Sequence, residues 1–287
     1  MQAVKSKIKK IFYRNEIDGL RGIAILSVVL YHIFPSIFPS GFLGVDIFFV
    51  ISGYLITATI INNNRNNLIE FLFQFYSKRL KRLFPTLFIF FIFTIFGLCL
   101  FIPEPKEFIE AGISSLVGLS NIYLWIKETD YFAQTAELNP FTQTWSLGIE
   151  SQFYFIYPLL YWCTRSENTL KYTNKFFNLI LILSSLSFIS FISFIKTDEP
   201  TAYFLIFSRF WEIGSGCLSC MFFQKYKKLK IYLPTFPIFF IFLSLIFLPE
   251  SFNIISIFLI ILITNIIINF CYKDSLCYNI LTFKPLV

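Results

Sequence analysis

Long apolar runs, separated by short polar or basic segments, dominate the sequence. Several runs reach the roughly 20 residues that a helix needs to cross a hydrocarbon core about 30 Å thick. They lack the alternation of polar and apolar residues that is typical of a membrane β-barrel. The pattern therefore predicts an all-α fold, a polytopic transmembrane helical bundle with about eight spans. The expected spans are residues 19–38, 41–61, 83–102, 145–163, 176–195, 202–223, 231–248 and 253–271.

The basic residues set the expected orientation, because cytoplasmic loops of membrane proteins are enriched in Lys and Arg. Such residues concentrate in segments 1–17, 62–82, 164–175 and 224–230, which we interpret as cytoplasmic, together with both termini. Residues 111–126 are also apolar, but a span there would place two of the basic segments outside. We therefore expect 103–144 to be one external region with an interfacial or re-entrant piece.

The composition agrees with a membrane protein. Of 287 residues, 56% are hydrophobic and 14% charged, which is too apolar for one soluble domain. The formal net charge of +7 could indicate nucleic acid, but basic loops explain it better, so we expect a lipid bilayer and no nucleic-acid partner. The six cysteines are scattered and there is a single histidine. No metal site is therefore expected.

Arg21 and His32 are the most unusual residues within the apolar runs. Eleven positions separate them, so on one helix they would lie on the same face, offset by roughly 20° and about 16 Å apart along the axis. A charge within an apolar span usually faces a protein interior or a wet cavity. His32 could equally be a core histidine with a structural hydrogen bond, and Arg21 an ordinary anchor at the membrane surface.

Two carboxylates are expected at about the depth of His32. Asp46 lies near the external start of span 41–61, and Glu150 lies about one turn into span 145–163. A carboxylate beside an imidazole is the arrangement that orients a general base.

Two further pairs have the three-residue spacing that places side chains on one helix face. Arg79 and Arg82 precede span 83–102, and both could also be cytoplasmic anchors. Arg209 and Glu212 lie at middle depth in span 202–223. That second pair is either an ion pair that neutralises two buried charges or a part of a polar path.

At these residues the chain resembles the acyltransferase 3 family of bacterial integral membrane acyltransferases, which modify cell-surface sugars. Five segments match the motifs of the family in order. They are NEIDGLRGIAILSVVLYH with Arg21 and His32, GFLGVDIFFVISGYLI with Asp46 and Ser52, RLKRLFP with Arg79 and Arg82, QTWSLGIESQFYFIYPL with Trp145 and Glu150, and SRFWEIGSGCL with Arg209 and Glu212.

The resemblance implies a reaction and a location. The donor would be acyl-CoA, usually acetyl-CoA, used as a co-substrate from the cytoplasm, with no bound cofactor. The acceptor would be a hydroxyl of a surface glycan or lipid-linked sugar, of the O-antigen (lipopolysaccharide), exopolysaccharide or peptidoglycan type. The protein would be a multi-pass protein of the bacterial cytoplasmic (inner) membrane.

The resemblance also assigns roles. In the family the opening Arg and His are needed for transfer, and the paired arginines are associated with the donor. We expect Arg21, Arg79 and Arg82 to bind the phosphates of the donor at the inner end of a cavity through the membrane. His32 would act as the general base or carry the acyl group, with Arg21, Asp46 and Glu150 as further catalytic residues. The remaining motif residues would line the cavity or be structural: Ser52, Trp145, Arg209 and Glu212.

One departure from the family pattern is expected to matter. The membrane domain of the family has about ten spans, and this sequence ends at FKPLV, where a further motif would begin. We therefore expect residues 1–287 to be one acyltransferase-3-like transmembrane domain that is incomplete at its C-terminus and has no soluble domain. The alternatives are a transporter for a glycan or its lipid carrier, which would not depend on acyl-CoA, and an inactive truncated membrane protein.

Overall fold

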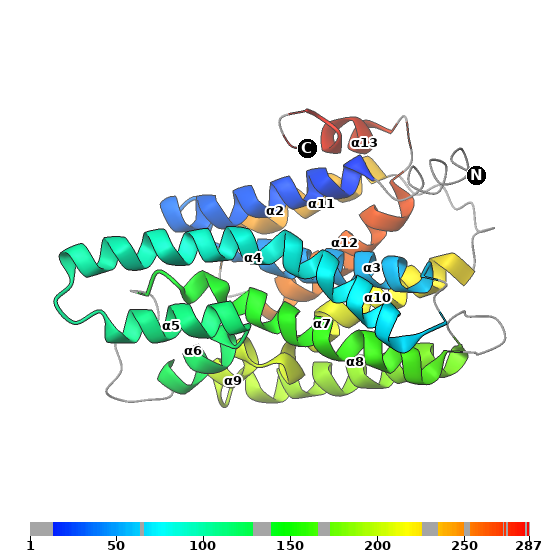
Figure 1. Cartoon of the computed structure of the whole chain (residues 1–287). Coiled ribbons are helices and arrows are strands. Elements are labelled where there is room, and N and C mark those ends of the chain that lie inside the picture. Colours follow the sequence, from blue (N-terminus) through cyan, green and yellow to red (C-terminus); the bar gives the residue numbers. More distant parts are fainter. Residues whose placement is uncertain are drawn as a thin grey trace. The chain divides into compact units, whose positions relative to one another are not determined.

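The computed structural model describes residues 14–63, 66–128, 139–165, 173–225, 235–249, 253–271, 273, 275–284 and 286. These residues form α-helices and short 3-10 helices and no strand, which confirms the predicted all-α class (Figure 1). The basic segments 1–13 and 226–230, and the first residues of the predicted span 231–248, lie outside the described residues.

Among the described residues, three helices are long and apolar enough to cross a membrane: Gly41–Ile61, Leu68–Phe101 and Asn174–Phe194. Two shorter apolar helices, Thr235–Leu245 and Ile254–Phe270, match the last two predicted spans in position. The fold is therefore a set of apolar helices, while the predicted number of spans and the cytoplasmic location of both termini stay predictions.

The contacts divide the chain into two compact units, and the division falls within two helices. Unit 1 contains the chain up to Leu55 and from Ser215 onward. It includes α2 (Asn15–Ile33), η1 (Gly41–Leu43) and most of α3 (Gly44–Ile61). From the C-terminal part it includes the second half of α10 (Ile206–Lys225), α11 (Thr235–Ser244), η4 (Leu245–Phe247), α12 (Asn253–Phe270) and α13 (Leu276–Leu281).

In unit 1, α2 ends earlier than the predicted span 19–38 because of Pro35. The residue before a proline avoids the helical region, and Phe34 has φ −133° and ψ 64°. Two hydrogen bonds from Ser40 attach the following turn to η4 and to the residue after it. The backbone N–H of Ser40 donates to Ile246 O (3.1 Å), and its hydroxyl donates to Leu248 O (2.6 Å). The predicted turn before span 41–61 is thus confirmed.

The chain then returns alongside α2 through two glycines. A Cβ atom at Gly41 or Gly44 would overlap the backbone of α2, at Ser27 O and Ala24 O respectively. Small residues at such positions let helix backbones approach closely. The contact buries Ala24 and Ser27 and fixes α3 against α2.

Unit 2 contains Ile56 to Gly214. It includes the end of α3, α4 (Leu68–Phe101), α5 (Lys106–Val117), α6 (Ser120–Glu128) and η3 (Thr142–Thr144). It continues with α7 (Trp145–Thr164), α8 (Asn174–Phe194), α9 (Glu199–Phe204) and the first half of α10. The predicted span 202–223 is therefore interrupted at Leu205, whose backbone is extended (φ −95°, ψ 138°).

Helix α4 corrects the prediction of a loop at 62–82 followed by a separate span. It is one helix of 34 residues, about 51 Å long at 1.5 Å per residue. It begins at Leu68, where the Asn67 side chain accepts from Ile69 N–H (2.9 Å), and it continues through Pro85. The basic cluster therefore lies on the same helix as the apolar run. The most hydrophobic stretch of α4 has no buried residue, as expected of a surface that faces lipid.

The segment 111–126 forms parts of two short helices, α5 and α6. Gly118 ends α5 with φ +76°, a left-handed conformation that glycine adopts without steric cost. Helix α6 follows and ends at Glu128. Neither helix is long enough to span a bilayer, so the structure agrees with an interfacial or re-entrant piece, whose external location stays a prediction.

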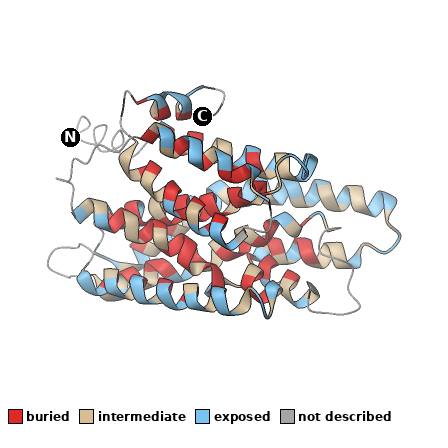
Figure 2. Ribbon diagram, turned by 180° about the vertical axis from the view of Figure 1, so that it is seen from behind, coloured by how far each residue is buried: buried red, intermediate tan, exposed pale blue. Residues whose placement is uncertain are grey.

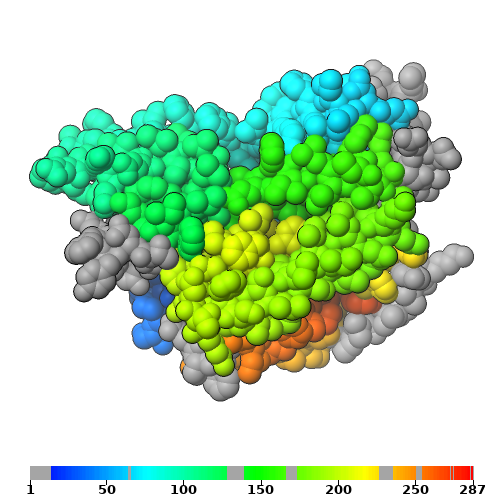
Figure 3. Space-filling model, turned by 90° about the horizontal axis from the view of Figure 1, so that it is seen from below, coloured from blue at the N-terminus to red at the C-terminus, as the bar shows by residue number. Residues whose placement is uncertain are grey.

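The core of unit 2 is formed around the aromatic face of α7. Phe176 on α8 lies against Tyr157 and Tyr161 on α7, with 5.4 Å between ring centroids in both pairs. Helix α8 runs beside α7 (Figure 3). Its buried residues share one face and its exposed apolar residues the other, as the colouring shows (Figure 2). The exposed set is Leu181, Ile182, Leu186, Ile189 and Ile192.

Candidate functional site

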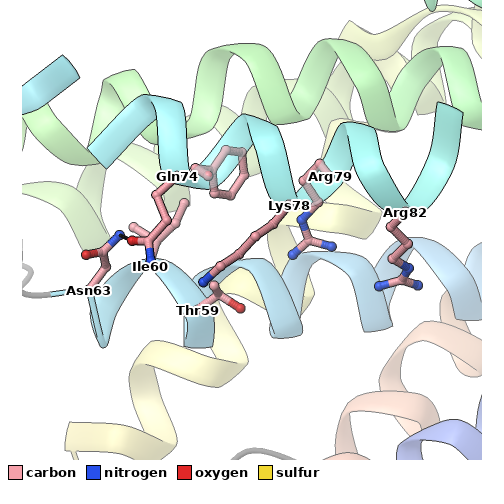
Figure 4. A pocket seen from close by; sticks show the side chains of 8 residues that line it. Thr59, Ile60, Asn63, Gln74, Lys78, Arg79 and Arg82 are labelled. Atoms are coloured by element: carbon pink, nitrogen blue, oxygen red, sulfur yellow. Dashed lines mark hydrogen bonds between the residues drawn. The ribbon is translucent and has the colours of Figure 1, made fainter. Parts of the chain in front are cut away.

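A pocket of about 210 Å³ in unit 2 lies between the end of α3 and the first half of α4 (Figure 4). It is lined by Thr59, Ile60, Asn63, Gln74, Phe75, Lys78, Arg79 and Arg82. The α4 side is helical although it was predicted as loop, and this helix gives the basic residues a fixed register.

Three cationic side chains make this pocket suited to an anion. Lys78, Arg79 and Arg82 lie within about one turn of α4, and their side chains extend toward α3 (Figure 4). None of the described residues that line the pocket is acidic. Arginine and lysine in this density are typical of phosphate recognition. The predicted donor-binding pair, Arg79 and Arg82, is thus brought together in one pocket.

Sequence reasoning missed Lys78 and the α3 side of the pocket. Lys78 precedes Arg82 by four positions, a spacing that places both on one helix face and that could have identified it. Thr59 and Asn63 carried no such signal, because their proximity to α4 depends on how α3 and α4 pack. The Asn63 amide donates to Gln74 Oε1 at 3.3 Å (Figure 4), which joins the two walls.

Arg79 is held by aromatic rings. Its Cζ atom lies 5.7 Å from the centroid of Phe75, one turn earlier on α4, and 5.3 Å from the centroid of Tyr154 on α7. These distances are in the range of cation–π attraction. Tyr154 in turn donates its phenol to Glu150 Oε2 at 2.6 Å. The structure therefore connects Glu150, which was predicted as a catalytic residue, to the pocket arginine.

In unit 1, Arg21 and His32 both lie on α2, as their spacing predicted. Arg21 forms an ion pair with Asp18 (Nη1 to Oδ1, 3.1 Å), and both side chains are about a quarter exposed. Asp18 was not predicted, although its three-residue spacing from Arg21 is visible in the sequence. The pair places a partly neutralised cation near the start of α2.

His32 is exposed, and its Nδ1 atom lies 2.8 Å from the carbonyl oxygen of Val28, one turn earlier. A carbonyl oxygen only accepts hydrogen bonds, so Nδ1 carries a hydrogen. In the neutral ring the lone pair is therefore on Nε2, the atom that would accept a proton. The backbone carbonyl thus favours one tautomer and helps to orient the ring, and the orienting role expected of Asp46 or Glu150 stays a prediction.

The two other predicted residues of unit 1 lie on α3. Asp46 is in its first turn and is 3% exposed, where the partial positive charge of a helix N-terminus favours a carboxylate. Ser52 lies six residues further along the same helix and is also buried. The roles of both residues stay predictions.

Arg209 and Glu212 form the buried ion pair that was one of the two alternatives for them. Arg209 Nη1 lies 2.7 Å from Glu212 Oε1, and the side chains are 4% and 0% exposed. Three rings surround the guanidinium, with Cζ 5.7 Å from the centroid of Trp145, 5.3 Å from Phe191 and 4.9 Å from Tyr203. This arrangement favours a structural role for Trp145, Arg209 and Glu212.

Comparisons with known proteins agree with these motifs. A family model described as an acyltransferase domain matches residues 14–277. The peptidoglycan O-acetyltransferase OatA of Listeria monocytogenes is 32% identical over 211 residues, which cover 71% of this chain and 33% of that protein. The O-acetyltransferase OatA of Staphylococcus aureus (strain NCTC 8325) is 34% identical over 210 residues, 72% of this chain and 34% of that protein.

The chain matches only part of each relative, because it spans between 26% and 34% of the length of curated relatives that it matches. No solved structure matches the chain. Because the acyltransferase model covers nearly all of the sequence, from the residue before α2 to α13, the chain belongs to the acyltransferase 3 family.

Proposed function

We propose that this protein is a membrane O-acyltransferase that transfers an acyl group, first of all acetyl, from acyl-CoA to a hydroxyl of a surface glycan. Family membership and the names of the two relatives support this proposal. The apolar helices support a multi-pass location in the bacterial cytoplasmic membrane. The name of the Listeria relative favours a glycan of the peptidoglycan type over O-antigen or exopolysaccharide.

The pocket with Lys78, Arg79 and Arg82 is the observation that carries the proposal. Coenzyme A bears a 3′-phosphate and a pyrophosphate, and three cations in a pocket whose described lining holds no acidic side chain would bind such groups well. The pocket volume of about 210 Å³ suits the phosphate-bearing part of the donor, so its thioester arm would extend beyond the lining residues. The positive-inside pattern of the surrounding segment supports access from the cytoplasm.

His32 is the proposed catalytic base in unit 1. Its Nε2 atom would take the proton of the acceptor hydroxyl while the hydroxyl oxygen attacks the thioester carbonyl carbon. The bond between that carbon and sulfur then breaks, and the proton held by His32 passes to the departing thiolate. The hydrogen bond from Nδ1 to Val28 O keeps the ring in the tautomer that this step needs.

The test uses membranes that contain the full chain, incubated with acetyl-CoA that is radiolabelled in the acetyl group. We expect base-labile label in the glycan fraction, as an ester would give. A variant with Arg79→Gln and Arg82→Gln should lose most of this label at low donor concentration and recover part of it at high concentration. Glycan movement without any label, and without dependence on acetyl-CoA, would instead identify a transporter.

A further inference from the structure

The side chain of Tyr154 links two residues whose roles were predicted separately. Tyr154 follows Glu150 by four positions on α7 and donates to Glu150 Oε2 at 2.6 Å. The face of the same ring lies 5.3 Å from the Cζ atom of Arg79 on α4. Tyr154 is only 7% exposed, while Arg79 and Glu150 are partly buried.

This arrangement restricts Arg79 more than a single contact would. An arginine side chain has many rotamers, and fixing one of them costs conformational entropy. Here the aromatic rings of Phe75 and Tyr154 both lie close to the Arg79 guanidinium. Cation–π attraction is stronger at desolvated sites. A phenol that donates a hydrogen bond to an ionised carboxylate also has a more electron-rich ring, which strengthens that attraction further.

A second tyrosine keeps α4 and α7 in register at this point. Tyr76 donates its phenol to Phe155 O at 3.0 Å, and the rings of Tyr76 and Phe155 stack with centroids 6.4 Å apart. Tyr76 lies three positions before Arg79, and Phe155 directly follows Tyr154. These contacts therefore hold α4, which carries the cations, against α7, which carries the Glu150–Tyr154 pair.

We propose that Tyr154 is a positioning residue that holds the Arg79 guanidinium ready for the donor phosphates, and that Glu150 acts through Tyr154. This inference rests on the proposed donor site. It assigns Glu150 to the binding of the acyl donor. The pocket is thereby organised before the donor arrives, which reduces the entropy cost of binding.

The experiment measures coenzyme A affinity by calorimetry, and KM and kcat for acetyl-CoA, on the full chain in detergent. We expect Tyr154→Leu to weaken coenzyme A binding and raise KM about three- to tenfold, with kcat within about twofold. Tyr154→Phe and Glu150→Gln should each give about a two- to threefold shift in the same direction, because the ring stays in place. Either of these variants also serves if Tyr154→Leu fails to fold.

Two controls separate positioning from general packing. Tyr161, a buried tyrosine on the same helix, lies against Phe71 and Phe176, and Tyr161→Phe should leave coenzyme A affinity unchanged. In the Arg79→Gln background, Tyr154→Leu should add no further loss, because coupled residues are not additive.

Three outcomes would overturn the inference. They are an equal loss from Tyr154→Leu with and without Arg79, a change in kcat alone, and unchanged affinity in Tyr154→Leu while Arg79→Gln and Arg82→Gln weaken binding. If the two arginine variants themselves leave coenzyme A binding unchanged, the proposed donor pocket is wrong and the inference falls with it.

Discussion

His32 Nδ1 is bonded to the backbone carbonyl of Val28 at 2.8 Å, one turn earlier on the same helix. Through this bond α2 itself helps to orient the imidazole. Because Nδ1 carries the hydrogen of the bond, Nε2 holds the lone pair of the neutral ring.

Replacing His32 tests whether Nε2 is the reacting atom. His32→Ala should lower acetyl transfer by at least about 100-fold, the usual lower size of a general-base contribution. His32→Asn keeps a donor near the position of Nδ1 and lacks Nε2, so it should be as inactive as the alanine variant. The measurement is transfer of radiolabelled acetyl to glycan in membranes with matched protein content. Retained activity in His32→Asn would remove Nε2 from the mechanism.

Neutralising the pocket cations should weaken donor binding without lowering kcat. We expect Lys78→Gln, Arg79→Gln and Arg82→Gln each to raise the Kd for coenzyme A by about tenfold, since each removes a charge-assisted contact. The effect should shrink at high salt because Arg82 and Lys78 are exposed.

Lys81 gives the matched control for this series. It belongs to the same basic cluster and is exposed, but it does not line the pocket. Lys81→Gln should therefore leave the Kd within about twofold. An equal loss from Lys81→Gln would show that net positive charge, and not this pocket, attracts the donor.

The buried ion pair between Arg209 and Glu212 should matter for stability. Glu212→Gln leaves the guanidinium buried among three rings without its counter-charge, which should cost about 3–5 kcal/mol of unfolding free energy. Unfolding in detergent, followed by circular dichroism, measures this loss. The partly exposed pair of Lys127 and Glu107 (2.9 Å) is the comparison, because Glu107→Gln should cost less than about 1 kcal/mol. Equal costs for both would contradict a structural role of the buried pair.

Close contact between α2 and α3 gives a fourth prediction. Gly44→Ala places a Cβ atom against Ala24 O and Ser27 Oγ, and such overpacking typically costs about 1–3 kcal/mol. Gly97→Ala on α4 meets nothing within 4 Å and should be neutral or slightly stabilising, because alanine favours helix. The same unfolding measurement ranks the two variants, and a Gly44→Ala protein as stable as Gly97→Ala would show that α2 and α3 have room to separate.

The sequence by itself determined which residues share a helix. Arg21 and His32 lie on α2, and Arg209 and Glu212 form an ion pair three residues apart, because the helical repeat fixes such relations locally. The end of α2 before Pro35 follows from an equally local rule, although the predicted span continued to residue 38. The ordered motifs around these residues also gave the family.

The sequence failed where a local signal was absent or was outweighed. The polar start and basic end of residues 62–82 suggested a loop, but α4 begins at Leu68 and continues through Pro85. A single proline removes one backbone hydrogen bond, which a helix of 34 residues tolerates.

Only the tertiary structure decided which helices meet. The ring of Tyr154 lies beside Arg79, and Thr59 and Asn63 complete the pocket opposite the α4 cations. Helical periodicity indicates the helix face on which a side chain lies. Which other helix packs against that face depends on how the side chains of distant segments interdigitate. The four-residue spacing of Glu150 and Tyr154 is visible in the chain, but the contact of the Tyr154 ring with Arg79 depends on such packing, and for that physical reason no spacing could have predicted it.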